Sequence, residues 1–194
     1  MNLATTLAER APLPDGLTLA AIDFLCGRTK RHLQGSESDE AAFAADMVNY
    51  PIAAHTDAAN AQHYEIPPEF FALILGPNRK YSCCLYPTDN TTLEEAEICA
   101  LETTCGHADL KDGQTILELG CGWGSLSLYM AKTYPNARIV SVSNSQSQRA
   151  HIEAQAARRG LTNLMVITAD MNDFITMERF DRVVSVEMFE HMSN

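Results

Sequence analysis

The sequence predicts an α/β fold built on a parallel β-sheet, with a helical region in front of it. From Lys111 onward, short apolar runs alternate with stretches whose apolar residues recur at helical spacing. The runs are almost continuously apolar, as in TILELG and NLMVITAD, which is typical of strands covered on both faces. We therefore expect helices on both faces of the sheet.

Residues 1–110 are predicted to be mainly helical. Apolar spacing indicates helices over 17–33 and 41–55, the second interrupted at Pro51, and an amphipathic turn at the end of 57–75. A further helix over 91–110 would begin at Thr91 or Thr92, whose hydroxyls suit an N-cap, and would have Gly106 near its end. This part of the chain is expected to form a helical N-terminal extension.

Residues 111–194 are predicted to hold the sheet. Strands are expected at 115–120, 137–143, 163–170 and 180–189, with helices at 122–135 and 147–160 between the first three. Because an open parallel sheet usually has more strands, we expect the sheet to be truncated after strand 4 and the chain to be the N-terminal part of a longer protein. Because one edge of the sheet would be uncovered, we expect the chain expressed alone to be poorly soluble or self-associating and to show no measurable methyl transfer.

Composition and charge exclude several classes of partner. The formal net charge of −11 would repel a nucleic-acid backbone or an anionic membrane surface. No run approaches the roughly 18 apolar residues of a membrane span, and the start of the chain lacks the apolar core of a secretory signal, so a cytoplasmic protein is expected. The six cysteines form no C-x-x-C pair and the six histidines are scattered, so no metal site is expected.

The strongest chemical signal is the glycine-rich segment LELGCGWG at 117–124, where the first predicted strand turns into a helix. Glycines there let the main chain approach a ligand closely. A dinucleotide site would need glycine or alanine at Ser125 and an acidic residue near 141–145, where there is none. The G-x-G-x-G spacing after an acidic strand residue instead indicates a loop that binds S-adenosylmethionine (SAM). The alternative is a tight turn without a ligand.

Several segments in a fixed order extend this interpretation to a family. They are HYEIPPEFF, KYSCCLY, ILELGCGWGSLSLYMA, SVSNSQSQ and VSVEMFEHM, between about residues 60 and 194. Together they resemble the cyclopropane-fatty-acid synthase superfamily of SAM-dependent methyltransferases, and within it the coclaurine N-methyltransferase type of amine methyltransferases. The resemblance implies a class I methyltransferase, Rossmann-like fold with SAM as cofactor. Residues 111–194 would be the SAM-binding domain, and 1–110 a helical lid over the cofactor and substrate site.

The resemblance also implies which residues bind SAM, with Tyr81 and Ser82 at its carboxylate end. The full set is Tyr81, Ser82, Gly120, Gly122, Asn144, Gln148, Asp170, Met171 and Val186. Two of these residues have a structural alternative. Ser145 and Gln148 have the spacing of a capping box, in which Gln148 would serve only the backbone. Asp170 ends a strand, where solvated carboxylates are common.

A second signal is E-M-F-E-H at 187–191, at the carboxyl end of the fourth predicted strand, where open α/β sheets bind ligands. A protonated amine has no lone pair to attack a methyl group, so a base that takes its proton accelerates the transfer. The leading hypothesis is a SAM-dependent N-methyltransferase of a small, alkaloid-like amine. Glu190 and His191 would act as base and orienter, and Glu187 would recognise the cation. A helix first turn with acids at its N-terminus is the structural alternative.

Two other functions remain open. The lipid-modifying branch of the resembled superfamily transfers methylene to an unsaturated lipid with bicarbonate as base. Its bicarbonate ligands correspond to Cys83 and Glu190, and both are present. That branch has glycine at the position of Glu187, so glutamate here favours an amine substrate. The third possibility is a truncated chain that binds SAM weakly or not at all and does no catalysis.

Overall fold

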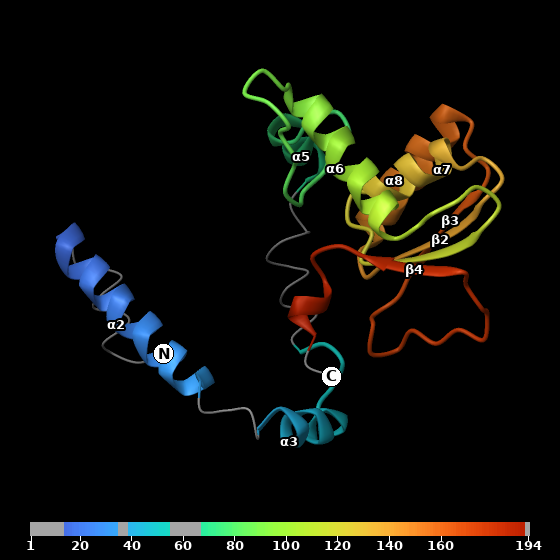
Figure 1. The fold of residues 1–194 in the computed structure, drawn as a ribbon. Helices are drawn as coiled ribbons and strands as arrows, with labels where there is room; N and C mark the ends of the chain where they lie inside the picture. The colour runs from blue at the N-terminus through green and yellow to red at the C-terminus, as the bar shows by residue number, and fades with distance from the viewer. Residues whose placement is uncertain (1–13, 35–38, 55–66, 193–194) are drawn as a thin grey trace. The chain divides into compact units, whose positions relative to one another are not determined.

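The computed structural model describes residues 14–34, 39–54 and 67–192, which fall into two compact units. The first unit, residues 1–50, contains α2 (Asp15–Gln34), α3 (Asp39–Asp46) and the 3-10 helix η1 (Met47–Asn49) (Figure 1). The helices expected at 17–33 and 41–55 are thus present, and the second ends before Pro51. Tyr50 is extended, as expected for a residue that precedes proline.

The second unit, residues 51–194, begins its regular structure with α5 (Pro68–Ile74) and α6 (Leu93–His107). Thr92 is the N-cap of α6 and forms a reciprocal capping box with Glu95. Gly106 lies in its last turn, as predicted. The part of the predicted 57–75 segment before Pro67 lies outside the described residues. Within the described ranges, no helix combines the length and apolar character needed to cross a membrane.

The sheet has four parallel strands, β1 (Thr115–Leu119), β2 (Arg138–Ser143), β3 (Leu164–Thr168) and β4 (Arg182–Ser185). Helix α7 (Ser125–Thr133) connects β1 to β2, and α8 (Gln146–Arg159) connects β2 to β3 (Figure 1). The strand order is β3-β2-β1-β4, so the chain changes direction across the sheet at β1. Such a switch point is where open α/β sheets bind ligands. The predicted fold class is confirmed.

Strand β4 is shorter than predicted, because it ends at Ser185 instead of continuing to Phe189. Two residues beyond it, Glu187 has φ of 53°, a left-handed conformation through which an extended strand cannot continue. The chain then makes one 3-10 turn, η2 (Phe189–His191). The E-M-F-E-H segment is therefore not part of the sheet, as it would have been in a longer strand.

The described helices of the second unit cover only one face of the sheet, so the prediction of helices on both faces is wrong for this part of the chain. On that face the largest apolar cluster joins the sheet to α6 and α7 through Leu101, Cys105, Ile116, Met130, Ile139 and Val184. The other face meets the irregular 169–180 connection, including Phe174 and Phe180. Within this connection Asp170 accepts hydrogen bonds from the backbone and side-chain amides of Asn172, a local turn that competes with helix formation.

Candidate functional site

A cavity of about 780 Å³ lies at the carboxyl ends of the strands, where the sequence places the site. The predicted SAM-binding and amine-site residues that line it are Tyr81, Ser82, Gly120, Gly122, Asn144, Gln148, Asp170, Met171, Val186, Glu187 and His191. Glu190 and Cys83, the two positions that correspond to bicarbonate ligands, do not line it. The residues that follow all four strands contribute to its wall. The structure therefore brings together side chains that are more than 100 residues apart in the sequence.

The glycine-rich loop approaches the cavity with its main chain. Gly120 and Gly122 both have positive φ, 78° and 52°. A Cβ on Gly120 would lie 2.7 Å from the sulfur of Met188, whereas a Cβ on Gly122 would meet no protein atom within 4 Å. Gly122 thus borders open space inside the cavity, and a side chain there would occupy room that a ligand can use.

Three buried polar side-chain atoms lack a hydrogen-bond partner among the described residues, and all belong to residues of the cavity wall. They are Nε1 of Trp123, Oγ of Ser125 and Nε2 of Gln148. Buried polar atoms are normally paired, so each is a position at which a bound ligand can supply the missing partner. The cavity is consequently suited to a ligand with several hydrogen-bonding groups.

Gln148 does not form the capping box that its spacing allows. Ser145 caps α8 by accepting a hydrogen bond from the backbone N–H of Gln148 at 3.3 Å. The reciprocal bond is absent, because the N–H of Ser145 donates to Ser143 Oγ instead. The side-chain oxygen of Gln148 accepts from the same Ser143 hydroxyl at 2.6 Å, which leaves its amide nitrogen for a ligand.

Glu118 is a buried acid in the cavity wall that is not among the site residues predicted from the sequence. Its carboxylate accepts hydrogen bonds from Ser127 Oγ at 2.5 Å and Ser141 Oγ at 2.7 Å. Burial raises the pKa of this carboxyl group, and the two hydroxyl donors partly oppose that rise. The signal in the sequence was an acidic residue inside an otherwise apolar strand.

A second missed residue, Glu97 of α6, holds the loop that carries Tyr81 and Ser82. Its fully buried carboxylate accepts the backbone N–H groups of Asn78 at 2.9 Å and Lys80 at 3.1 Å, and the Asn78 side chain at 3.2 Å. A Cβ on Gly76 would lie 2.5 Å from this carboxylate, so the chain passes directly against it. The position of the loop therefore depends on one buried acid.

Glu187 faces the loop from the other side of the cavity. Its carboxylate accepts a hydrogen bond from the backbone N–H of Cys83 at 3.3 Å. Glu190 and His191 follow on η2, and both are exposed. Of these two, His191 reaches the cavity wall, whereas Glu190 lies on the same turn without lining the cavity.

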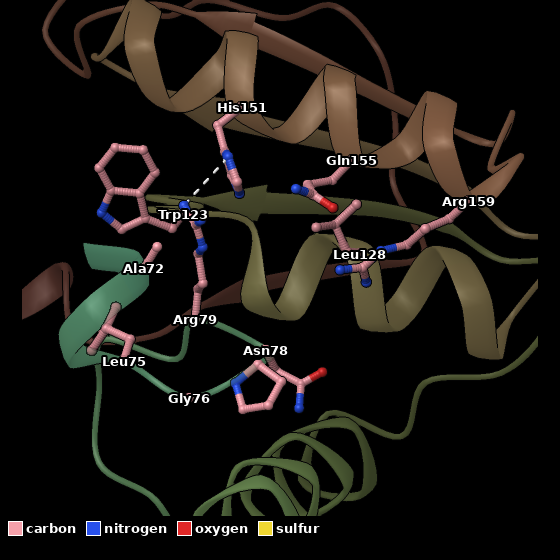
Figure 2. A pocket seen from close by; sticks show the side chains of 11 residues that line it. Ala72, Leu75, Gly76, Asn78, Arg79, Trp123, Leu128, His151, Gln155 and Arg159 are labelled. Carbon is pink, nitrogen blue, oxygen red and sulfur yellow. Dashed lines mark hydrogen bonds between the residues drawn. The ribbon is translucent and has the colours of Figure 1, made fainter. Parts of the chain in front are cut away.

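A smaller cavity of about 390 Å³ lies between α5, the loop after it, and α8 (Figure 2). Its polar lining includes Arg79, His151, Gln155 and Arg159, with no acidic residue. Arg79 Nη1 and His151 Nδ1 are 3.5 Å apart, as the dashed line in Figure 2 marks. With arginines and no acid, this cavity is unfavourable for a cation such as a sulfonium or an ammonium. The larger cavity also contains Arg79 and Lys80, but its wall adds the acids Glu118, Asp170 and Glu187, which favour a cation near them.

His151 is expected to destabilise the fold as the pH falls. Burial first, and then the charges of Arg79, Arg158 and Arg159, lower the pKa of His151 from 6.5 to about 4. Its contribution to stability is complete above pH 6.5 and is lost as the pH falls toward 4, because the unfolded chain then binds the proton more tightly. For this half-buried group we expect a loss of about 1–2 kcal/mol between pH 7.5 and 4.5.

Urea unfolding of the wild type and of His151→Gln at both pH values measures this effect. The difference in unfolding free energy between the two proteins should change by the amount above, since the other groups titrate equally in both. A difference that stays constant between pH 7.5 and 4.5 would contradict the assignment.

Comparison with known proteins identifies relatives of two chemical kinds. Residues 53–194 match the family model described as mycolic acid cyclopropane synthetase. The chain is 44% identical over 143 residues to (S)-coclaurine N-methyltransferase of Thalictrum flavum subsp. glaucum, covering 74% of this chain and 40% of that protein. It is 34% identical over 138 residues to cyclopropane mycolic acid synthase 1 of Mycobacterium tuberculosis, covering 70% and 47%.

One solved structure that matches this chain is also an N-methyltransferase. The crystal structure of coclaurine N-methyltransferase bound to N-methylheliamine and SAH (S-adenosylhomocysteine) matches with a TM-score of 0.72 at 39% identity. The match covers 88% of this chain and 52% of that one. The chain thus spans about half the length of the curated relatives it matches.

Proposed function

We propose, because this chain belongs to the mycolic acid cyclopropane synthetase family, that it binds SAM and methylates the nitrogen of a small, alkaloid-like amine. The similarity to (S)-coclaurine N-methyltransferase supports an amine acceptor. The observation that carries the choice of acceptor is the conformation of Glu187.

Glu187 holds a carboxylate at the cavity in a backbone conformation that disfavours it. A non-glycine residue in the left-handed region costs about 1–2 kcal/mol, whereas glycine adopts it freely. The carboxylate lines the cavity and is oriented by the N–H of Cys83. A carboxylate kept there attracts an ammonium group, but it contributes nothing to binding the hydrocarbon chain of a lipid. This supports an amine as the acceptor.

The cavity also fits the cofactor. Its unpaired Trp123 and Gln148 nitrogens are hydrogen-bond donors, and the Ser125 hydroxyl can donate or accept. We assign SAM binding to these groups, to the main chain at Gly120 and Gly122, and to the other predicted residues of the wall, Tyr81, Ser82, Asn144, Asp170, Met171 and Val186. When bound, SAM supplies the methyl group from a sulfonium centre.

In this proposal, the residues after β4 attract the amine and remove its proton. Glu187 draws the ammonium form of the substrate to the cavity, where its charge is complementary. His191 accepts the proton, which frees the nitrogen lone pair, and such a base contributes roughly 10²- to 10⁴-fold to a rate. Glu190, its neighbour on η2, shares this role as base or orients the imidazole.

We assign to residues 1–110 the role of a lid, and the reaction to the cytoplasm. Ala53, Ala54, Tyr81 and Ser82 line the cavity, which supports the first assignment for the segments that contain them. The six cysteines are all free, which suits a reducing compartment. Slower amide hydrogen exchange in residues 67–110 after SAH is added would support the lid, and unchanged exchange would count against it.

Gly122→Ala is expected to weaken SAH binding at least 10-fold while lowering stability by about 1 kcal/mol. The added methyl group enters the open space of the cavity and strains a positive φ. Gly160→Ala is the matched control, because Gly160 also has positive φ with nothing within 4 Å but lies at the end of α8, outside the cavity. Calorimetric titration and thermal melting compare the two. Equal SAH affinity in both variants would remove Gly122 from the site.

The proposed function is tested with labelled SAM and the purified protein. One pool of amines and one of unsaturated phospholipids are offered separately, and the label is followed. Label in the amine pool supports the proposal. Label in lipid alone would overturn it in favour of the lipid-modifying chemistry, and SAH binding without label in either pool would indicate a non-catalytic protein.

A further inference from the structure

Lys80 is the one buried basic side chain among the described residues, with 7% of its surface exposed. It lines the large cavity, and its ammonium donates a hydrogen bond to the hydroxyl of Ser82. Within the described ranges it forms no ion pair: the four salt bridges there involve other residues. A buried cation without an anionic partner is unfavourable, so the site is suited to a ligand that brings an anion.

Hydrogen bonds hold the backbone on both sides of Lys80, and this restricts where its ammonium group can lie. Glu97 accepts the backbone N–H of Lys80, together with both amide groups of Asn78. This carboxylate therefore anchors the main chain, and its hydrogen bonds are directed to amides and not to the ammonium. On the other side of the loop, Glu187 holds the N–H of Cys83. The Lys80 side chain extends from a segment held at both ends.

We propose that the ammonium group of Lys80 binds the carboxylate of the amino-acid portion of SAM, an assignment that rests on the proposed function. Ser82, to which Lys80 donates, is assigned to that end of the cofactor. The carboxylate is the only anionic group of SAM, whose remaining charges are positive. The acids of the wall, Glu118 and Glu187 among them, are complementary to those positive groups. Arg79 and Lys80 both line the wall, but the guanidinium of Arg79 contacts Pro68 and His151, whereas the ammonium of Lys80 is buried beside Ser82 and is complementary to the carboxylate.

The test compares two ligands that differ only in the carboxylate: SAH and its decarboxylated form, S-adenosyl-3-thiopropylamine. Charge-assisted hydrogen bonds of this kind correspond to about 10- to 100-fold in affinity. Lys80→Met should lower SAH affinity by that factor in titration calorimetry and leave the affinity for the decarboxylated ligand unchanged. Lys80→Arg should recover part of the SAH affinity, since it restores the positive charge.

Lys132→Met, an exposed lysine in the last turn of α7, is the control for loss of one positive charge. It should change neither affinity. The assignment is overturned if Lys80→Met binds SAH as tightly as the wild type, or if it loses both ligands equally, which would indicate a structural role. A wild-type chain that binds neither ligand would overturn the proposed function as well.

Discussion

Replacing His191 with alanine is expected to lower kcat for amine methylation by about 10²- to 10⁴-fold, the loss associated with removing a general base. His191 lies in the cavity wall on η2, after the strand end at which the cavity opens. SAH affinity should change by less than about 2-fold, because the imidazole is assigned to the acceptor's proton. Steady-state kinetics and calorimetry on the purified protein measure both quantities.

His107→Ala is a matched control, since His107 is exposed in the last turn of α6 and does not line the cavity. Its kcat should equal that of the wild type. Glu187→Gln should mainly raise KM for the amine, because it removes a charge that attracts the substrate. A His191→Ala protein with wild-type kcat would shift the role of base to Glu190.

Glu97→Ala is expected to lower the free energy of unfolding by about 2–5 kcal/mol. The change removes a buried carboxylate and leaves the N–H groups of Asn78 and Lys80 without their acceptor. The loop that carries Tyr81 and Ser82, the residues we assign to SAM, would then lose its anchor, so SAH affinity should fall together with stability. Urea denaturation and calorimetry measure the two effects.

Glu94→Ala provides the comparison, because Glu94 is an exposed acid in the first turn of the same helix. Its loss should cost no more than about 0.3–1 kcal/mol, through the helix dipole alone. If Glu97→Ala were as mild as Glu94→Ala, the buried carboxylate would not be what holds the loop. If affinity fell without any loss of stability, Glu97 would act on the ligand directly.

Much of the second unit follows from local patterns in the sequence. The apolar runs located the four strands, and α8 is capped by Ser145 at its N-terminus and by Gly160, a glycine with φ of 67°, at its C-terminus. These features depend on neighbours within a few residues, so the sequence reports them directly. The residues of the cavity wall could be predicted from the sequence for a different reason. The carboxyl ends of parallel strands meet at one edge of the sheet.

The features that could not be predicted depend on distant contacts. Glu97 resembles the exposed acids around it in α6, and only the fold shows that it is buried under the 76–80 loop. Lys80 likewise resembles a solvated loop residue. The coverage of the sheet was misjudged because the 169–180 connection buries phenylalanines without forming a helix. Glu190 lies next to His191 on η2 but does not line the cavity, a difference that depends on the path of the chain after β4.

The left-handed backbone at Glu187 also has a consequence for how this site changes over generations. Glutamate and glycine codons differ by one nucleotide, and Glu187→Gly releases the strain of a positive φ at an exposed position while it removes the hydrogen bond from the N–H of Cys83. Because the two effects on stability oppose each other, a single nucleotide change there costs the fold little. Glutamate persists at such a position only under selection for what its carboxylate binds, and a lineage released from that selection should drift to glycine.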